Sequence, residues 1–140
     1  MIRQGGAIVA IMIIGSAMGC GSGANMPTAL RAGRGVYGDR CSSCHGNSGQ
    51  GGVGPSLADV RETWPECDDQ QAWIALGSVN WKAERGPTYG ADDTPVTKVM
   101  PGHAETLSPE EIAQVAAFER VEYGSGDPVE ELEACGLPAD

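Results

Sequence analysis

The stretch CSSCHGNSGQGGVGP, residues 41–55, constrains the fold of this chain more than any other part of the sequence. It places Cys41, Cys44 and His45 within five residues and continues through a glycine-rich run to Pro55. Two thiols and an imidazole at this spacing can hold a metal ion, form a redox dithiol or attach a cofactor covalently. Each of these chemistries needs a different fold around it, so the remaining sequence discriminates between them.

The rest of the chain argues against the first two chemistries. A C-x-x-C redox pair usually sits in a thioredoxin-like βαβ unit, and no parallel-sheet pattern is present. A structural zinc ion needs four protein ligands, and no second ligand pair has suitable spacing. In C-x-x-C-H the two thiols can form thioethers to a haem, while the adjacent histidine binds the iron. The sequence therefore predicts one covalent haem c, attached through Cys41 and Cys44, with His45 as an axial ligand.

A haem iron used for electron transfer needs a second axial ligand, for which the sequence offers few candidates. Beyond the first twenty residues the methionines are Met26 and Met100, and His103 is the only other histidine. Pro101 and Gly102 follow Met100 and keep the chain out of a helix, as a ligand-bearing loop requires. We predict Met100 as the ligand. His103 is the alternative and would lower the reduction potential, whereas methionine raises it.

The N-terminal segment MIRQGGAIVAIMIIGSAMGC is typical of an export signal. Arg3 precedes an apolar run at residues 7–14, which is too short for a membrane span of ~20 residues. The ending AMGC resembles a bacterial lipobox, so residues 1–19 are predicted to be cleaved and Cys20 to be lipidated. An uncleaved anchor and an ordinary signal peptide are the alternatives. All three place the protein outside the cytoplasm, and the lipobox places it on the extracytoplasmic face of a bacterial cytoplasmic membrane.

Two cysteines, Cys67 and Cys135, remain once the haem motif and the lipobox are accounted for. An even remainder in an oxidising compartment predicts a disulfide between them, and two unrelated free thiols are the alternative. The formal net charge of −10 excludes binding of nucleic acid or of an anionic bilayer by charge. Such a surface suits a partner with a basic docking patch, although solubility alone also accounts for it.

The helical signals are few, and the class they predict is all-α with long loops. Residues 20–28 are a glycine-rich tether, followed by a first helical candidate at residues 28–41. A second is expected from Asp68 or Asp69 to Gly77, and a third from the N-cap Ser108 to Gly124. Residues 126–140 read as an acidic tail. The sequence between residues 77 and 100 shows no periodic element, and no convincing strand is predicted.

Residues 29–124 resemble the class I, monohaem c-type cytochromes, in the form of a bacterial membrane-tethered lipoprotein. The motifs that carry the resemblance are G-x-x-V-Y-x-x-x-C-x-x-C-H from Gly33, G-P-x-L from Gly54, W-I-x-x-G-S from Trp73, V-M-P-G from Val99 and L-S-P-E-E-I-x-x-V-x-x-F from Leu107. It implies a class I cytochrome c fold, a small helical bundle around one haem, here spanning residues 29–125. It also implies a close helix crossing at Gly33, an aromatic contact between Tyr37 and Phe118, and a hydrogen bond from the His45 ring to the Pro55 carbonyl.

These patterns predict a membrane-tethered carrier of single electrons between extracytoplasmic respiratory proteins, not an enzyme and without a small-molecule substrate. A fixed haem subunit of a larger membrane oxidoreductase or terminal oxidase is the first alternative. A haem sensor or peroxidase with an open distal position is the second. Four aromatic residues could wall the haem or simply pack in the core: Trp64, Trp73, Trp81 and Tyr89. Four cationic residues could pair with the haem propionates: Arg61, Lys82, Arg85 and Lys98.

Overall fold

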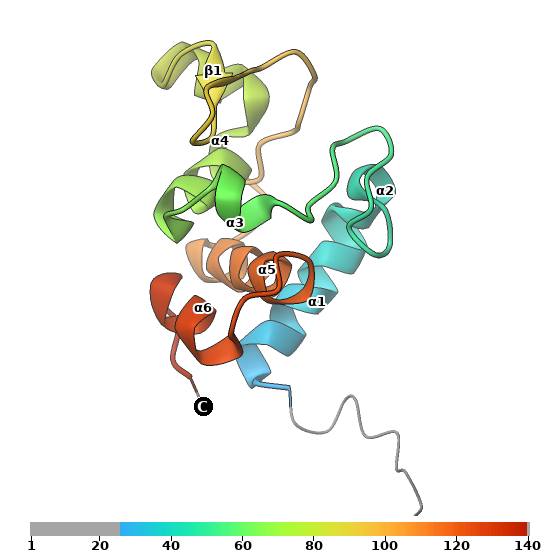
Figure 1. Ribbon diagram of the computed structural model, residues 1–140, viewed down its shortest axis with the longest axis vertical. Helices are drawn as coiled ribbons and strands as arrows, with labels where there is room; N and C mark the ends of the chain where they lie inside the picture. The colour runs from blue at the N-terminus through green and yellow to red at the C-terminus, as the bar shows by residue number, and fades with distance from the viewer. Residues whose placement is uncertain (1–25, 140) are drawn as a thin grey trace, which may run out of the picture.

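The computed structural model describes residues 26–139. The predicted signal segment 1–19, the lipidation site Cys20 and most of the tether lie outside the described residues. The elements, in chain order, are α1 (Thr28–Arg40), α2 (Ser42–His45), α3 (Val60–Thr63), α4 (Cys67–Glu84), β1 (Thr88–Tyr89), β2 (Thr94–Pro95), α5 (Pro109–Glu122) and α6 (Pro128–Ala134) (Figure 1). Within residues 26–139, no helix combines the length and the apolar character that crossing a membrane would require.

The crossing of α1 and α5 forms the centre of the core. Gly33 allows this approach, because a side-chain carbon at this position would overlap the backbone carbonyl of Gln114. One helical turn further along α1, the Tyr37 ring lies 5.7 Å from the Phe118 ring, centroid to centroid. Val115 on α5 is completely buried in the same core cluster. Both contacts that the family resemblance implied for this crossing are present.

Helix α5 begins as its sequence predicts, with a reciprocal cap. The Ser108 hydroxyl accepts a hydrogen bond from the Glu111 backbone N–H, at 3.2 Å, and the Glu111 carboxylate accepts one from the Ser108 N–H, at 2.8 Å. Pro109 occupies the first helical position, where its missing N–H costs nothing. The cap fixes where α5 starts and therefore which of its residues face the core.

Helix α4 differs from its prediction at both ends. It begins at Cys67 without a side-chain cap from Asp68 or Asp69, and it does not stop at Gly77. Gly77 adopts φ 65° and ψ 176°, so the helix kinks there and resumes as far as Glu84. The glycine is needed for space as well, since a Cβ would collide with the backbone around Met100. The predicted stop signal is thus a bend that lets the chain after β2 lie against α4.

A short strand pair and a C-terminal helix were also not predicted. Strands β1 and β2 form an antiparallel ladder two residues long, too short for a detectable alternation. The segment expected to be an acidic tail contains α6, capped by the Asp127 carboxylate, which accepts hydrogen bonds from the N–H groups of Val129 and Glu130. Leu132 of α6 is fully buried, so α6 is part of the core.

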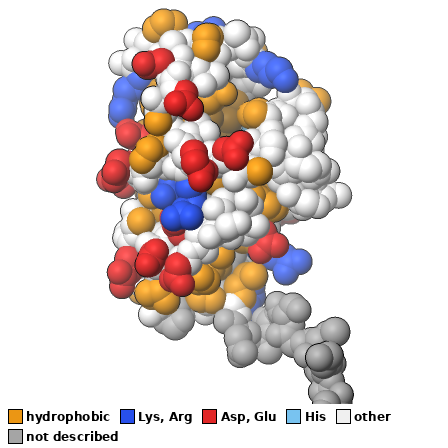
Figure 2. Space-filling model, viewed as in Figure 1, with side chains coloured by type: hydrophobic (Ala, Val, Ile, Leu, Met, Phe, Trp, Pro, Cys, Tyr) orange, Lys and Arg blue, Asp and Glu red, His pale blue; other side chains and the backbone are white. Residues whose placement is uncertain are grey.

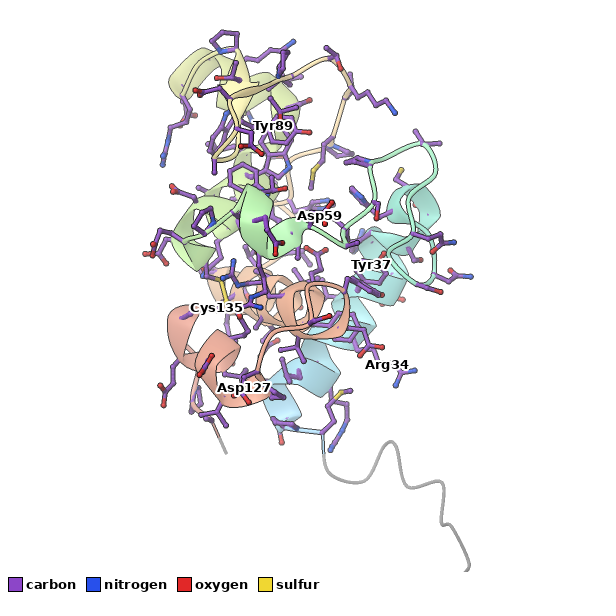
Figure 3. The ribbon with its side chains drawn as sticks, in the orientation of Figure 1. Arg34, Tyr37, Asp59, Tyr89, Asp127 and Cys135 are labelled. Atoms are coloured by element: carbon purple, nitrogen blue, oxygen red, sulfur yellow. A yellow bond between two sulfur atoms is a disulfide. The ribbon has the colours of Figure 1, made fainter. Side chains whose placement is uncertain are left out.

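A disulfide joins Cys67 at the start of α4 to Cys135 at the end of α6 (Figure 3). One turn before Cys135, the Glu131 carboxylate of α6 forms ion pairs with Arg120 of α5 and, at 2.7 Å, with Arg61 of α3. The Arg120 guanidinium also donates to the backbone carbonyl of Trp64, at 2.7 Å. The covalent bond and the ion pairs together fix α6 against three other helices.

We expect Gly33→Ala to destabilise the haem-loaded protein by about 1–3 kcal/mol, because the new methyl group overfills the α1–α5 crossing. Gly35→Ala on the same helix is the matched control, since a Cβ there meets nothing within 4 Å. The control should stabilise the protein by roughly 0.5–1 kcal/mol through helix propensity. Urea unfolding measures both changes, and equal effects of the two substitutions would contradict the crossing.

Removing the disulfide by the double substitution Cys67→Ala/Cys135→Ala should lower the free energy of unfolding by about 4 kcal/mol. The expected loss is large because the bridge spans 68 residues and so restricts the unfolded chain strongly. Urea unfolding of the variant and of the oxidised parent gives the difference. Under reducing conditions the parent should approach the variant, and a persistent gap would point to loss of packing instead.

Candidate functional site

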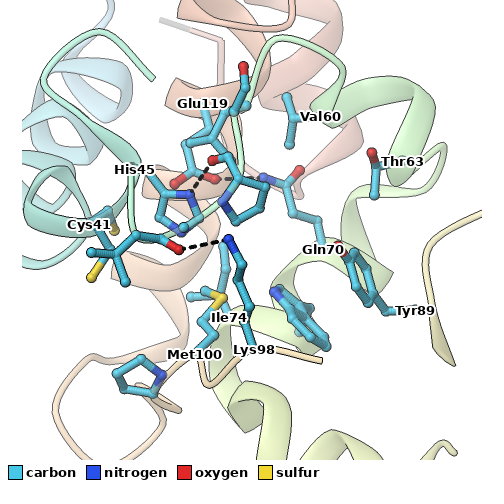
Figure 4. Close-up of a pocket in the computed structure, with 18 of the residues that line it drawn as sticks. Cys41, His45, Val60, Thr63, Gln70, Ile74, Tyr89, Lys98, Met100 and Glu119 are labelled. Carbon is cyan, nitrogen blue, oxygen red and sulfur yellow. Dashed lines mark hydrogen bonds between the residues drawn. The ribbon is translucent and has the colours of Figure 1, made fainter. Parts of the chain in front are cut away.

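A cavity of about 360 Å³ opens between the α2 region, α4 and the segment carrying Met100. Cys41 and His45 line one side of this cavity and Met100 lines the other (Figure 4), and Cys44 also lines the cavity. In Figure 2 the hollow lies in the upper part of the visible face and is lined mostly by hydrophobic atoms. The structure therefore brings the sequence-predicted attachment cysteines and both halves of the predicted iron site to one place.

His45 is held by a hydrogen bond that sets the orientation of its ring. Its Nδ1 lies 2.9 Å from the Pro55 carbonyl oxygen, which can only accept, so Nδ1 carries the proton. In the neutral imidazole this leaves the other ring nitrogen, Nε2, as the one that can bind a metal. His45 is also buried, which limits its ring to this arrangement.

The glycine-rich loop between His45 and Pro55 is shaped by close approach to the ring. A Cβ on Gly54 would lie 2.9 Å from Cε1 of His45, closer than packed carbon atoms come. The loop is fixed to the motif by backbone bonds, from the Gly51 N–H to the His45 carbonyl at 2.7 Å and from the Gly54 N–H to the Cys44 carbonyl at 2.9 Å. The glycines thus let the chain return under the imidazole and present the Pro55 carbonyl to it.

Met100 is held in place through its backbone by Ser78, the residue that follows the kink of α4. The Ser78 hydroxyl accepts from the Met100 N–H at 3.0 Å, and the Ser78 N–H donates to the Met100 carbonyl at 2.9 Å. Lys98 Nζ donates to the Val53 carbonyl at 3.2 Å, which links the Met100 segment to the glycine-rich loop. His103, the alternative ligand, also lines the cavity. Burial, and secondarily the nearby Arg40, lowers the pKa of its imidazole.

Cys41 and Cys44 are the free cysteines among residues 26–139, as thioether formation requires. Burial raises the pKa of the Cys41 thiol to about 12, so this sulfur is a neutral thiol in the folded chain before attachment. No group of three or more His, Cys, Asp or Glu side chains within residues 26–139 could hold a metal ion by itself. The donor set, two thiols beside one oriented imidazole with a thioether opposite, fits a haem and does not fit zinc.

Only some of the aromatic and cationic residues proposed as haem neighbours line the cavity. Trp64, Trp73 and Tyr89 line the cavity, with the Trp73 and Tyr89 rings stacked at 4.7 Å. Trp81 packs behind them and donates its indole N–H to the Thr88 carbonyl at 2.8 Å. Lys98 is the one of the four predicted propionate partners that lines the cavity. The others lie elsewhere: Arg61 pairs with Glu131, Arg85 lies over Trp81, and Lys82 is an exposed residue of α4.

A family model for cytochrome c matches residues 30–118, well over half of the chain. The chain belongs to the cytochrome c family. It therefore binds haem c covalently, and the members of this family are electron carriers. Cytochromes of this kind act outside the cytoplasm with redox proteins as partners, which agrees with the export signal predicted from the sequence.

The solved structures that this cytochrome resembles include c-type cytochrome XoxG from Methylobacterium extorquens AM1. The identity is 17% and the TM-score 0.50, over 73% of this chain and 55% of XoxG. Cytochrome cL from Hyphomicrobium denitrificans is 23% identical over 77% of this chain and 66% of its own, with a TM-score of 0.45. Cytochrome cL from Methylophaga aminisulfidivorans MPT is 27% identical over 80% of this chain and 70% of its own, with a TM-score of 0.41. A search of curated proteins gave no match.

At its identity and TM-score, XoxG supports the fold alone, and this cytochrome spans little more than half of XoxG's length. The shared fold confirms the class that the sequence predicted, a helical class I cytochrome c.

Sequence reasoning missed two cavity residues, Glu119 of α5 and Gln70 of α4. Both are buried, at 6% and 1% exposure, and Gln70 Nε2 donates to Glu119 Oε2 at 2.9 Å. Burial raises the pKa of Glu119 from 4.5 to about 8, against the opposing effect of the Gln70 hydrogen bond. Helical spacing could have revealed the glutamate, because it lies four residues after Val115 on the buried face of α5.

We expect the stability of the haem-loaded protein to depend on pH through Glu119. The unfolded chain ionises this carboxyl near its ordinary pKa of 4.5, whereas the folded protein keeps it protonated up to about 8. Glu119 therefore contributes its full stabilisation below the unfolded-state pKa. As the pH rises from there to the folded-state pKa, the free energy of unfolding falls by up to about 1.4 kcal/mol per pH unit. Glu119→Gln should remove this slope from urea-unfolding free energies, and an unchanged slope would contradict the buried carboxyl.

Proposed function

We propose that this cytochrome is a membrane-tethered, monohaem carrier of single electrons between extracytoplasmic respiratory proteins, with its iron held by His45 and Met100. The observation that supports it most is the arrangement of the cavity. His45 and Met100 line opposite sides of the space beside Cys41 and Cys44, and each is fixed by hydrogen bonds. Two fixed ligands leave no coordination position for a substrate, which is the requirement for electron transfer without bond-making at iron.

Met100 is favoured over His103 by how each residue is held. The Met100 backbone is bound on both sides by Ser78, which leaves its side chain free to extend into the cavity. The His103 N–H is instead bonded to the carbonyls of Ile74 and Ala75, at 3.0 and 3.1 Å, where the chain turns away toward α5. A thioether ligand also keeps the reduction potential higher than a second imidazole would, as suits a respiratory carrier.

The bound haem supplies one-electron exchange between ferric and ferrous iron. The residues of the chain hold and insulate the site for this exchange. Ile74, Trp64 and Trp73 exclude water from the cavity walls, which lowers the local dielectric around the iron. The His45–Pro55 hydrogen bond keeps the proximal imidazole in one orientation in both oxidation states, so little rearrangement accompanies electron transfer.

A lipid anchor on Cys20 would attach the carrier to the membrane. The helical domain starts at Thr28, so a lipid on Cys20 would keep it within a few residues of the membrane surface. Such a short link raises the effective concentration of the carrier near membrane-bound partners. Mass spectrometry of the protein extracted from membranes tests the anchor: a diacyl mass on an N-terminal Cys20 is expected, and an unmodified N-terminus further along the chain would contradict it.

A fixed subunit of a larger oxidoreductase is the second candidate, and the acidic surface favours it. Acidic side chains spread over much of the face in Figure 2, and α6 adds the exposed residues Glu130 and Glu133. Such a surface suits a permanent partner with a basic patch. Recovery in fixed proportion with a membrane complex after mild detergent extraction would support this candidate, and recovery of the cytochrome alone would support the free carrier.

Met100→Ala should abolish the weak red absorption band that the family resemblance implies for methionine-ligated ferric iron, because the sulfur ligand is lost. The open position should then bind carbon monoxide rapidly in the reduced state, whereas the parent should not. His103→Ala is the matched control and should retain the band and remain closed to carbon monoxide. Survival of the band in Met100→Ala would transfer the ligand role to another residue.

A further inference from the structure

Glu119 is a carboxyl in the wall of the haem cavity that no cation neutralises. Its hydrogen-bond partner is the neutral amide of Gln70, and no lysine or arginine among residues 26–139 forms an ion pair with it (Figure 4). The next residue, Arg120, directs its guanidinium to Glu131 and to the Trp64 carbonyl. A buried carboxyl without a cation holds its proton more firmly than an exposed one, since the charged form is desolvated.

A line of polar side chains connects Glu119 with the surface. Gln70 Oε1 accepts a hydrogen bond from Arg120 Nη1 at 3.4 Å, on the side of the amide opposite Glu119. Arg120 binds the Glu131 carboxylate, which also pairs with Arg61. The Arg61 side chain is 37% exposed, so this line of contacts reaches solvent. The buried carboxyl thus lies at the inner end of a polar network in an otherwise apolar core.

We propose that Glu119 takes up a proton when this cytochrome accepts an electron and releases it when the electron leaves. The electron comes from the donor protein and converts ferric to ferrous iron. The proton comes from solvent and forms the O–H bond of the Glu119 carboxylic acid, so the net charge of the cavity does not change. On oxidation the electron passes to the acceptor and the same proton returns to solvent. The proposal holds with either Met100 or His103 as the second ligand.

The coupling follows from the shared, water-poor cavity. An electron added there makes a nearby carboxylate less favourable, because charges interact strongly where the dielectric constant is low. The proton affinity of Glu119 is then higher in the reduced state than in the oxidised state. Burial already raises its pKa to about 8, so the carboxyl is poised where a change of one charge in the cavity alters its protonation near neutral pH.

The other groups around Glu119 are poorly suited to this role. Cys41, which follows α1, is consumed by the thioether, and burial raises the pKa of Tyr37 on α1 above its ordinary value. Burial also raises the pKa of Tyr123, which follows α5. Gln70 of α4 has no titrating proton, and the His45 Nδ1–H is directed at Pro55 rather than at Glu119. Of the remaining charged groups, Arg61 and Arg120 are paired with Glu131. Arg40 and Lys98 lie elsewhere on the cavity wall.

Two other sources of a proton need separate controls. His103 lines the same cavity, and its pKa lies below the ordinary value because the imidazole is buried. The haem propionates are carboxylates as well. A pH-dependent potential in the parent protein therefore assigns the proton to Glu119 only when substitution of that residue removes it.

The decisive measurement is the reduction potential of the haem-loaded protein across neutral and mildly alkaline pH. In the parent, the potential should fall by up to about 59 mV per pH unit where one proton accompanies each electron. Glu119→Gln, which imitates the protonated acid, should be flat across this range at the potential that the parent reaches at its acidic end. A flat parent, or a slope that persists in Glu119→Gln, would overturn the proposal.

Two matched variants separate this effect from general changes of charge. Glu122→Gln removes an exposed carboxyl from the same helix and should keep the slope of the parent. His103→Asn removes the other candidate and should also keep it. A slope lost in His103→Asn but kept in Glu119→Gln would assign the proton to the imidazole and refute the proposal.

A second approach holds even if Glu119→Gln fails to fold or to retain haem. Gln70→Leu deletes the hydrogen bond that favours the carboxylate, so the pH range of the slope should move upward; a range that stays in place would contradict the role of the pair. Redox difference infrared spectra of the parent should show a protonated-carboxyl band that appears on reduction at mildly alkaline pH and shifts in D₂O. Absence of that band would overturn the proposal without any variant.

Discussion

The close approach of α1 and α5 at Gly33 is the constraint on which the haem site depends. Because the two backbones touch there, the end of α1 delivers Cys41 and the motif that follows to a fixed place beside α5. The same crossing turns Glu119 toward the cavity, one residue beyond the Phe118 ring that packs on Tyr37. A larger residue at position 33 would move both walls of the cavity relative to each other, whatever its effect on helix formation.

The sequence predicted those features whose physical cause is local. The C-x-x-C-H spacing, the cap at Ser108 and the Pro101 break each act within a few residues, so they can be read without knowing the fold. The kink at Gly77 could not be read in this way, because a glycine there serves a backbone that arrives more than twenty residues later. Helix α6 was missed for the same reason, since only the apposed helices show that Leu132 is buried.

The polar network around Arg120 links the covalent and the electrostatic parts of the structure. Transferring two charged groups from water into the protein interior generally costs about as much free energy as their mutual attraction provides. The Arg120–Glu131 pair is therefore poor evidence for added stability. Its effect is better described as positional. Arg120 fixes the carbonyls of Trp64 and Pro65, and with them the walls of the cavity, while the disulfide holds Glu131 where Arg120 can reach it.

The bridge between Cys67 and Cys135 also bears on how the protein matures. Haem attachment consumes two thiols that must stay reduced, in a compartment that oxidises the other two. The two cysteines are 68 residues apart, so a chain exported N-terminus first cannot close the bridge until Cys135 has also emerged, long after Cys41 and Cys44. The haem motif would leave the cytoplasm well before the bridge can close. The wide separation of the two cysteines thus separates, in time, two thiol reactions that would otherwise compete.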